Sequence, residues 1–140
     1  MTIQPFHPGD FWRLKLQPAQ EYLASHITPE IAMRYANHGP ALTAWKDGRP
    51  IMCGGAYAWT DEGAMLWAWF SDDSGRHFYK LHRATERFID TLDYPRLVAL
   101  CRSGFVPAAR WLEMLGFSYL RTVPEYGPEC APHDCYLRVT

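Results

Sequence analysis

The sequence lacks the features of a membrane protein or a secreted protein. No apolar run approaches the ~20 residues that a membrane helix needs. The N-terminal stretch MTIQPFHPGDFW has no basic segment followed by an apolar one, as a signal peptide would have. The four cysteines are therefore expected to remain reduced thiols in a cytoplasm. With no internal repeat and no low-complexity tract, residues 1–140 are expected to form one soluble globular domain.

The chain also has almost no net charge, with 14 basic and 15 acidic residues and a formal charge of −1. A general attraction to nucleic acid or to an anionic membrane is therefore not expected. What the chain has in abundance is apolar material, 48% in all, of which an unusual share is aromatic. Core packing is the expected role of the stretch AYAWTDEGAMLWAWF, and any exposed part of it would favour a protein partner.

The hydrophobic pattern alternates between the periods of strands and helices. It predicts strands at 11–16, 41–45, 51–59, 64–70, 96–101, 118–123 and 135–139, and helices at 17–26, 28–39, 76–94 and 108–117. Thr28 is expected to cap the second helix, and Asp47–Gly48 to form a hairpin turn. Because helices and strands are interleaved, the pattern predicts an α/β or α+β domain with a mixed sheet.

The stretch AARWLEMLGF, residues 108–117, predicts a short helix that ends abruptly. Its apolar side chains share one face of the helix, at Ala108, Trp111, Leu112 and Leu115. Gly116 can adopt the left-handed conformation that closes a helix, and Phe117 can then fold back over the last turn.

This element order, with RHFYKLHRATERF, PRLVALC and AARWLEMLGF in their places, resembles the GNAT superfamily of acetyl-CoA-dependent acyltransferases. The resemblance covers residues 40–120 by motif and the first 40 residues by element order. It implies a mixed, twisted sheet of about six or seven strands flanked by about four helices. The stretches GRH, YPRL, RWLEMLGF and YGPE are most similar to the small GNAT-type proteins encoded by phages and prophages.

The resemblance implies acetyl-CoA as the co-substrate. In GNAT folds the two central strands, here near Trp69 and Leu100, splay apart, and the freed backbone groups pair with the pantetheine arm. The short helix would line that arm through Trp111. The pyrophosphate would lie on the N-terminus of the long helix, where unpaired N–H groups and the helix dipole favour anions.

The family's phosphate turn, Q/R-x-x-G-x-G/A, is matched only in part by residues 72–77, where Gly75 takes the place of the first glycine. Asp72 and Asp73 would repel a pyrophosphate, an effect that neighbouring polar and basic side chains partly offset. The residues that the resemblance assigns to the cofactor are Trp69, Phe70, Ser71, Ser74, Gly75, Arg76, His77 and Trp111. The alternative is an ordinary helix start that Ser74 or Asp73 caps while Asp72 is solvated.

Three polar groups that many GNAT enzymes use are missing. The strand at 64–70 has no acidic residue to act as general base, Leu112 stands where a Tyr protonates the leaving thiolate, and the usual Asn falls near Phe105. Tyr126, His133 and Glu62 are the candidate catalytic substitutes. Positioning and carbonyl polarisation alone can also support transfer to a neutral amine.

Two further patterns have simpler explanations. Cys130, His133 and Cys135 form C-x2-H-x-C, but the fourth ligand of a structural zinc site is not evident, so no metal is expected. The basic row Arg76, Lys80, Arg83 and Arg87 is longer than one nucleotide needs, and most of it is expected to be a solvated face.

The sequence thus supports two functions. The first is an acetyl-CoA-dependent N-acetyltransferase that acts on a primary amine of a small molecule or a protein, in the cytoplasm. The alternative is a catalytically degenerate GNAT fold that serves as a protein-binding module or in phage assembly, with the virion as its location. Neither function involves nucleic acid or a membrane.

Overall fold

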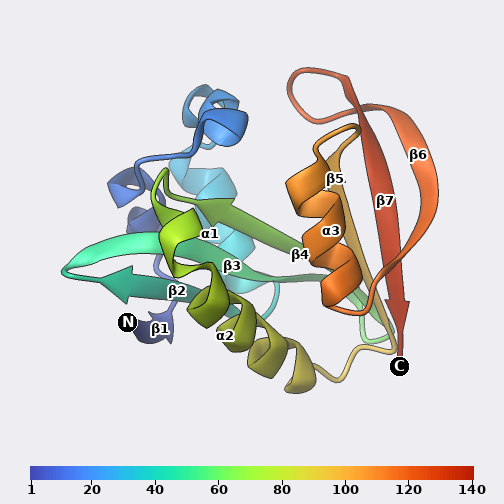
Figure 1. The fold of residues 1–140 in the computed structure, drawn as a ribbon, viewed down its shortest axis with the longest axis horizontal. Coiled ribbons are helices and arrows are strands. Elements are labelled where there is room, and N and C mark those ends of the chain that lie inside the picture. Colours follow the sequence, from blue (N-terminus) through green and yellow to red (C-terminus); the bar gives the residue numbers. More distant parts are fainter. The chain divides into compact units, whose positions relative to one another are not determined.

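The computed structural model describes residues 1–140, which divide into two compact units: Met1–Tyr57 with Trp67–Leu92, and Ala58–Leu66 with Asp93–Thr140. The strands are β1 (Thr2–Pro5), β2 (Ala41–Lys46), β3 (Arg49–Thr60), β4 (Gly63–Phe70), β5 (Arg96–Arg102), β6 (Ser118–Tyr126) and β7 (Ala131–Val139). The helices are α1 (Pro29–Asn37), α2 (Phe78–Asp90) and α3 (Val106–Met114), with 3-10 helices η1 (Pro8–Arg13), η2 (Pro18–Ser25) and η3 (Ser74–His77) (Figure 1).

All seven strands belong to one mixed sheet, in the order β1-β2-β3-β4-β5-β7-β6. The pair β4–β5 is parallel, whereas β5–β7 and β6–β7 are antiparallel. This arrangement confirms the predicted class, a mixed sheet with interleaved helices. None of the helices is both long enough and apolar enough to cross a bilayer.

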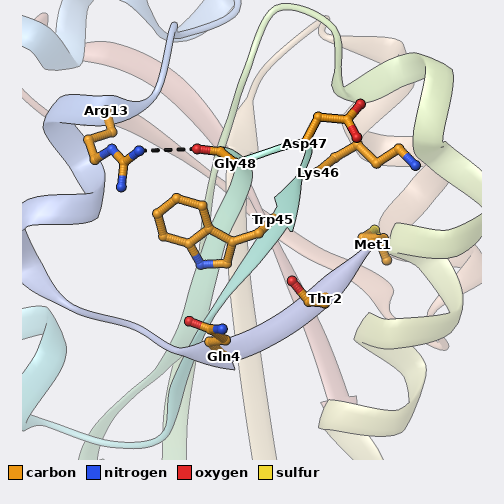
Figure 2. Close-up of a pocket in the computed structure, with 8 residues that line it drawn as sticks. All are labelled: Met1, Thr2, Gln4, Arg13, Trp45, Lys46, Asp47 and Gly48. Atoms are coloured by element: carbon orange, nitrogen blue, oxygen red, sulfur yellow. Dashed lines mark hydrogen bonds between the residues drawn. The ribbon is translucent and has the colours of Figure 1, made fainter.

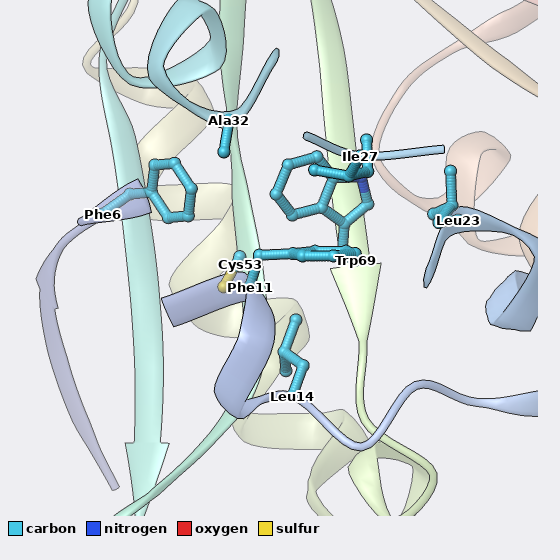
Figure 3. Close-up of a cluster of buried hydrophobic side chains, with 8 residues drawn as sticks. All are labelled: Phe6, Phe11, Leu14, Leu23, Ile27, Ala32, Cys53 and Trp69. Atoms are coloured by element: carbon cyan, nitrogen blue, oxygen red, sulfur yellow. The ribbon is translucent and has the colours of Figure 1, made fainter. Parts of the chain in front are cut away.

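The first unit is built around an aromatic cluster centred on Trp69 of β4. Trp69 is 4% exposed, and its ring centroid lies 4.9 Å from that of Phe11 and 5.9 Å from that of Phe6, edge to face in both cases. Figure 3 shows this ring surrounded by apolar side chains from η1, η2 and the start of α1. Core packing is therefore the role of this part of the aromatic stretch, as predicted.

Two local signals in the first unit are confirmed. Thr28 accepts a hydrogen bond from the N–H of Ile31 at 3.2 Å and so caps α1. Asp47 and Gly48, with φ of 51° and 75°, form the turn between β2 and β3. Both central residues of a type I′ turn have positive φ, which Asp and Gly tolerate better than other residues.

The prediction of a strand at 11–16 is wrong. That stretch contains the end of η1, a 3-10 helix whose start is capped reciprocally by His7 and Asp10. Gly9 N–H donates to His7 Nδ1 at 3.1 Å, and His7 N–H donates to the Asp10 carboxylate at 3.0 Å. The 3-10 turn buries Phe11 and Leu14 together, because residues three apart share one side of it. The first strand of the sheet is instead Thr2–Pro5, which pairs with β2.

In the second unit, α3 ends as predicted. Gly116 has a φ of +91°, and the N–H of Phe117 donates to Leu112 O at 2.9 Å, as in a Schellman motif. The hairpin of β6 and β7 is longer than predicted, because its register extends to Tyr126↔Ala131. Much of the stretch 124–133, which lies between the two predicted strands, is therefore strand.

Candidate functional site

The connection from β4 to α2 places an uncapped helix start at the surface. The N–H of Ser71 donates to Ile51 O at 3.0 Å, which ties the end of β4 to β3. Gly75 is exposed, and a Cβ built on it would have no heavy atom within 4 Å. No side chain caps η3, but the N–H groups of Ser74 and Arg76 donate to Ser71 O and Asp73 O, both at 3.2 Å, which leaves the N–H of Gly75 without a hydrogen bond. This turn is therefore open at Gly75.

Both carboxylates of the turn have partners elsewhere. Asp72 forms an ion pair with Lys15 at 3.2 Å, between side chains that are 38% and 85% exposed. Asp73 accepts a hydrogen bond from Ser71 Oγ at 2.7 Å, and this bond lowers the pKa of the Asp73 carboxyl, aided by the charges of Arg76 and His77. The alternative of a helix start capped by Asp73 is therefore wrong, since its carboxylate bonds to Ser71 instead. Asp72 is not simply solvated but paired.

The residues assigned to the cofactor lie in different environments. Gly75 and Arg76 are exposed, Phe70 and His77 are half-buried, and Ser71 and Ser74 are buried at 4% and 8% exposure. These six residues lie together in the first unit. The side chain of Trp69 belongs to the aromatic core. Trp111 lies on α3 of the second unit and is half-buried.

The end of β4 is paired with residues 15–20, which we call the strap. Gln17 N–H donates to Phe70 O at 2.9 Å, and Asp72 N–H donates to Lys15 O at 2.8 Å. An antiparallel bridge joins Leu16 to Ser71. The side-chain amide of Gln20 completes the pairing: its nitrogen donates to Ala68 O at 2.8 Å and its oxygen accepts from Phe70 N–H at 2.8 Å.

The strap occupies one particular edge of β4. The register with β5 runs from Gly63↔Arg96 to Leu66↔Ala99, and Glu62 O accepts from Arg96 N–H on that edge. Backbone groups of alternate residues point to the same edge of a strand. The backbone groups of Ala68 and Phe70 therefore point to the same edge of β4 as those of Glu62, which is the edge that pairs with β5 farther back along the strand. This is the stretch of backbone that the resemblance assigns to a pantetheine arm.

Tyr126 and His133 lie together in the second unit. Their ring centroids are 5.2 Å apart, edge to face. His133 Nδ1 donates to Ala131 O at 2.9 Å, because a carbonyl can only accept, so in the neutral ring Nε2 is the acceptor. The Tyr126 hydroxyl donates to Met65 Sδ at 3.7 Å, and burial, aided by Cys135, raises the pKa of that hydroxyl. Tyr126 thus remains a proton donor at neutral pH.

Glu62 is not part of this pair. Its carbonyl bonds to Arg96 at the start of β5, whereas His133 pairs with Arg102 at the other end of that strand. These two ends are roughly 20 Å apart along the strand. Glu62 is exposed, at the turn between β3 and β4. Leu112 is half-buried on α3, and it has no proton to give.

The buried thiols of Cys53 and Cys101 do not form a reactive site. Burial raises the pKa of Cys53 to about 12 and that of Cys101 to about 11. Both thiols are therefore protonated at neutral pH, and a protonated thiol is a poor nucleophile and a poor metal ligand. No group of three or more His, Cys, Asp or Glu side chains is arranged to hold a metal ion.

A groove with a volume of about 510 Å³ lies by the turn between β2 and β3, away from the predicted site residues. Arg13 crosses it, with its guanidinium 4.8 Å from the centre of the Trp45 ring and 3.1 Å from Gly48 O (Figure 2). The indole N–H of Trp45 is buried and has no hydrogen-bond partner. Because solvent does not reach that N–H, it offers no contact to a ligand in the groove.

Over nearly its whole length the chain has the fold of solved acetyltransferase structures. An N-acetyltransferase from Staphylococcus aureus Mu50 superposes with a TM-score of 0.74 at 12% identity, covering 99% of this chain and 96% of that one. An aminoglycoside 6′-acetyltransferase type Ii superposes with a TM-score of 0.73 at 14% identity, covering 99% and 97%. A GNAT-family acetyltransferase from Bacillus anthracis gives 0.66 at 12% identity, covering 98% and 93%. No protein-family model and no curated protein matches the sequence.

Sequence reasoning missed two residues of this region, Lys15 and Gln20. Gln20 bonds to residues 48 and 50 positions away along the chain. No local pattern indicates such a pairing, because the bonds depend on how the strap passes β4.

Proposed function

We propose that this protein is an N-acetyltransferase that takes acetyl-CoA as donor and a primary amine as acceptor. The observation that carries the proposal is the open, uncapped helix start at Gly75. An exposed helix N-terminus attracts phosphate through free N–H groups and its dipole, and here the free N–H is that of Gly75. Arg76 and His77 add basic groups at the same turn.

The charges of the turn support this use. Asp72 and Asp73 would oppose a diphosphate if their carboxylates faced the N–H groups. Instead, Lys15 offsets the charge of Asp72, and the Ser71 hydroxyl holds the Asp73 carboxylate. The helix start thus fits an anion despite a sequence that departs from the family's glycine-rich turn.

In the proposed reaction, acetyl-CoA supplies an acetyl group as a thioester. The acceptor nitrogen forms a bond to the carbonyl carbon as the carbon–sulfur bond breaks. The amine loses one proton and the departing sulfur gains one, so the reaction needs no redox partner. Nε2 of His133 is the group that can accept a proton, and the hydroxyl of Tyr126 is the group that can donate one.

The acceptor class is proposed more broadly. The aminoglycoside 6′-acetyltransferase with this fold is named for an amine-bearing small molecule. At 14% identity that likeness concerns the fold, so the acceptor proposed here is a primary amine of a small molecule or a protein.

Thermal unfolding with and without millimolar acetyl-CoA tests the proposal. A ligand at ~100 times its Kd adds ~2.7 kcal/mol, which raises the Tm of a domain of this size by several degrees. If no shift occurs, the proposed function is wrong.

Product formation with a panel of primary amines then tests the catalytic pair. Tyr126→Phe and His133→Gln should each slow acetyl transfer by about 10²-fold or more while the thermal shift remains. Tyr119→Phe is the matched control, because it removes an exposed hydroxyl of the same strand. Equal rates in all three variants would show that Tyr126 and His133 take no part in proton transfer.

A further inference from the structure

The end of β4 already holds an amide from the chain itself. Gln20 donates to Ala68 O and accepts from Phe70 N–H, both at 2.8 Å. This is the pairing that the backbone of a neighbouring strand makes with two alternate residues. The Gln20 side chain therefore acts as a short piece of strand on the edge of β4.

The pantetheine arm of acetyl-CoA carries two amides, each with one donor and one acceptor. An arm that pairs with β4 at Ala68 and Phe70 needs the same two backbone groups that Gln20 uses. Each N–H can donate one full hydrogen bond, so the ligand amide and the Gln20 amide compete for Phe70.

The surroundings of Gln20 allow the exchange. Both neighbours in the chain, Ala19 and Glu21, are exposed, whereas Gln20 is half-buried. The oxygen of Gln20 also accepts a hydrogen bond from the side-chain nitrogen of Gln17 at 3.2 Å. A change of the Gln20 rotamer would break this bond and the two bonds to β4, and it would require no movement of the buried core. The backbone of the strap keeps its own bonds to β4, from Gln17 to Phe70 O and from Asp72 to Lys15 O.

We propose that Gln20 is a displaceable amide gate: it occupies the hydrogen-bonding groups of Ala68 and Phe70 in the free protein, and the amide of the donor's arm replaces it. This inference rests on the proposed function, since it assumes that acetyl-CoA is the ligand. It assigns Gln20 a role in affinity and not in the chemical step. Gln20 also keeps the edge of β4 from standing unpaired when no ligand is bound.

The test compares two ligands on three variants. The ligands are acetyl-CoA and 3′-phosphoadenosine 5′-diphosphate, which has the same nucleotide but no pantetheine arm. The variants are Gln20→Ala, Gln20→Met, which keeps the length of the side chain without its amide, and the control Gln4→Ala. Gln4 is an exposed glutamine of the same unit.

Removing the competing amide should tighten binding of acetyl-CoA about 30-fold, because the two bonds together contribute on the order of 2 kcal/mol net. The affinity for the nucleotide should not change, and Gln4→Ala should match the wild type with both ligands. In the wild type, hydrogen exchange should show Phe70 N–H protected both with and without acetyl-CoA. In Gln20→Ala that N–H should be protected only with ligand.

Three outcomes would overturn the inference. Acetyl-CoA that binds Gln20→Ala and Gln20→Met no more tightly than wild type would show that Gln20 does not compete. If the Gln20 variants bind acetyl-CoA more weakly than wild type but bind the nucleotide equally well, Gln20 contacts the bound ligand and is not displaced by it. If acetyl-CoA binds no variant while Phe70 exchange responds to Gln20→Ala as expected, the pairing is real but the proposed function fails, and the gate fails with it.

Discussion

Two stretches of backbone near the end of β4 differ in how their hydrogen-bonding groups are used. At Ala68 and Phe70 the strap bonds to the strand edge. At Gly75, a short distance along the chain, the helix start is exposed and no side chain caps it. The first region needs something to leave before a ligand can pair with it, whereas the second can accept an anion as it stands.

The difference follows from the two kinds of structure involved. A strand edge presents both donors and acceptors, so any nearby amide can satisfy it. A helix start presents donors only. Here Ser74 and Arg76 donate to backbone carbonyls, while the carboxylates that could bond the N–H of Gly75 bond to Lys15 and Ser71 instead. Nucleotide binding is therefore expected to depend on charge at the helix start, and binding of the arm on competition at the strand.

Reversing the charge at the helix start should give the largest effect. Arg76→Glu replaces an attraction for the diphosphate by a repulsion, and we expect affinity for acetyl-CoA to fall by about 10- to 30-fold. Arg87→Glu is the control, because it makes the same change on α2 about 16 Å away, beyond the screening length in physiological salt. Calorimetric titration of both variants measures the difference. Equal losses in the two would mean that net charge, and not the helix start, governs binding.

Two glycine substitutions should give a smaller effect. They distinguish a glycine that lies in open space from a glycine whose backbone conformation requires the absence of a side chain. Gly116→Ala should lower the free energy of unfolding by roughly 1–2 kcal/mol, because its φ is +91° and Arg138 Nε lies 3.2 Å from the added methyl. Gly75→Ala should change it by less than about 0.5 kcal/mol, since nothing lies within 4 Å. Urea denaturation measures both. A large loss in Gly75→Ala would show that the helix start is not open.

The smallest expected effect concerns the Asp73 carboxylate. The pKa of this carboxyl is lowered in the folded protein, chiefly by the hydrogen bond from the Ser71 hydroxyl. The bond therefore stabilises the fold fully at pH values above the ordinary Asp pKa, and this stabilisation is lost as the pH falls through the lowered pKa of Asp73. Ser71→Ala should therefore cost under about 1.5 kcal/mol at pH 7 and less at pH 3. The pKa of Asp73 should also rise in the variant, which an NMR titration of its carboxyl carbon measures. A cost that is the same at both pH values would mean that Ser71 acts only through packing.

Local signals in the sequence predicted much of the fold. The Thr28 cap, the Asp47–Gly48 turn and the closure of α3 at Gly116 each depend on residues within one turn of one another. The prediction failed at the N-terminus, where apolar residues at 11–16 look like an alternating strand. There the reciprocal cap of His7 and Asp10 favours a 3-10 turn instead.

The candidate site was less predictable because its determinants are far apart in sequence. Asp72 appears unfavourable for an anion until its pairing with Lys15 is seen. Likewise, Gln20 has no sequence signal, since its partners belong to another element. Tyr126 and His133 are both candidates in the sequence, but only the register of β6 with β7 shows that their rings are in contact.

The central claim is that the helix start at Gly75 receives the diphosphate of the donor. The most direct test is an NMR titration in which 3′-phosphoadenosine 5′-diphosphate is added to the ¹⁵N-labelled protein. This ligand lacks the pantetheine arm with which Gln20 would compete. The account predicts that the amide signals of Gly75, Arg76 and His77 shift most and saturate together, and that those of the distant Asp47–Gly48 turn stay in place. Saturating shifts confined to another part of the chain, or none at all, would contradict it.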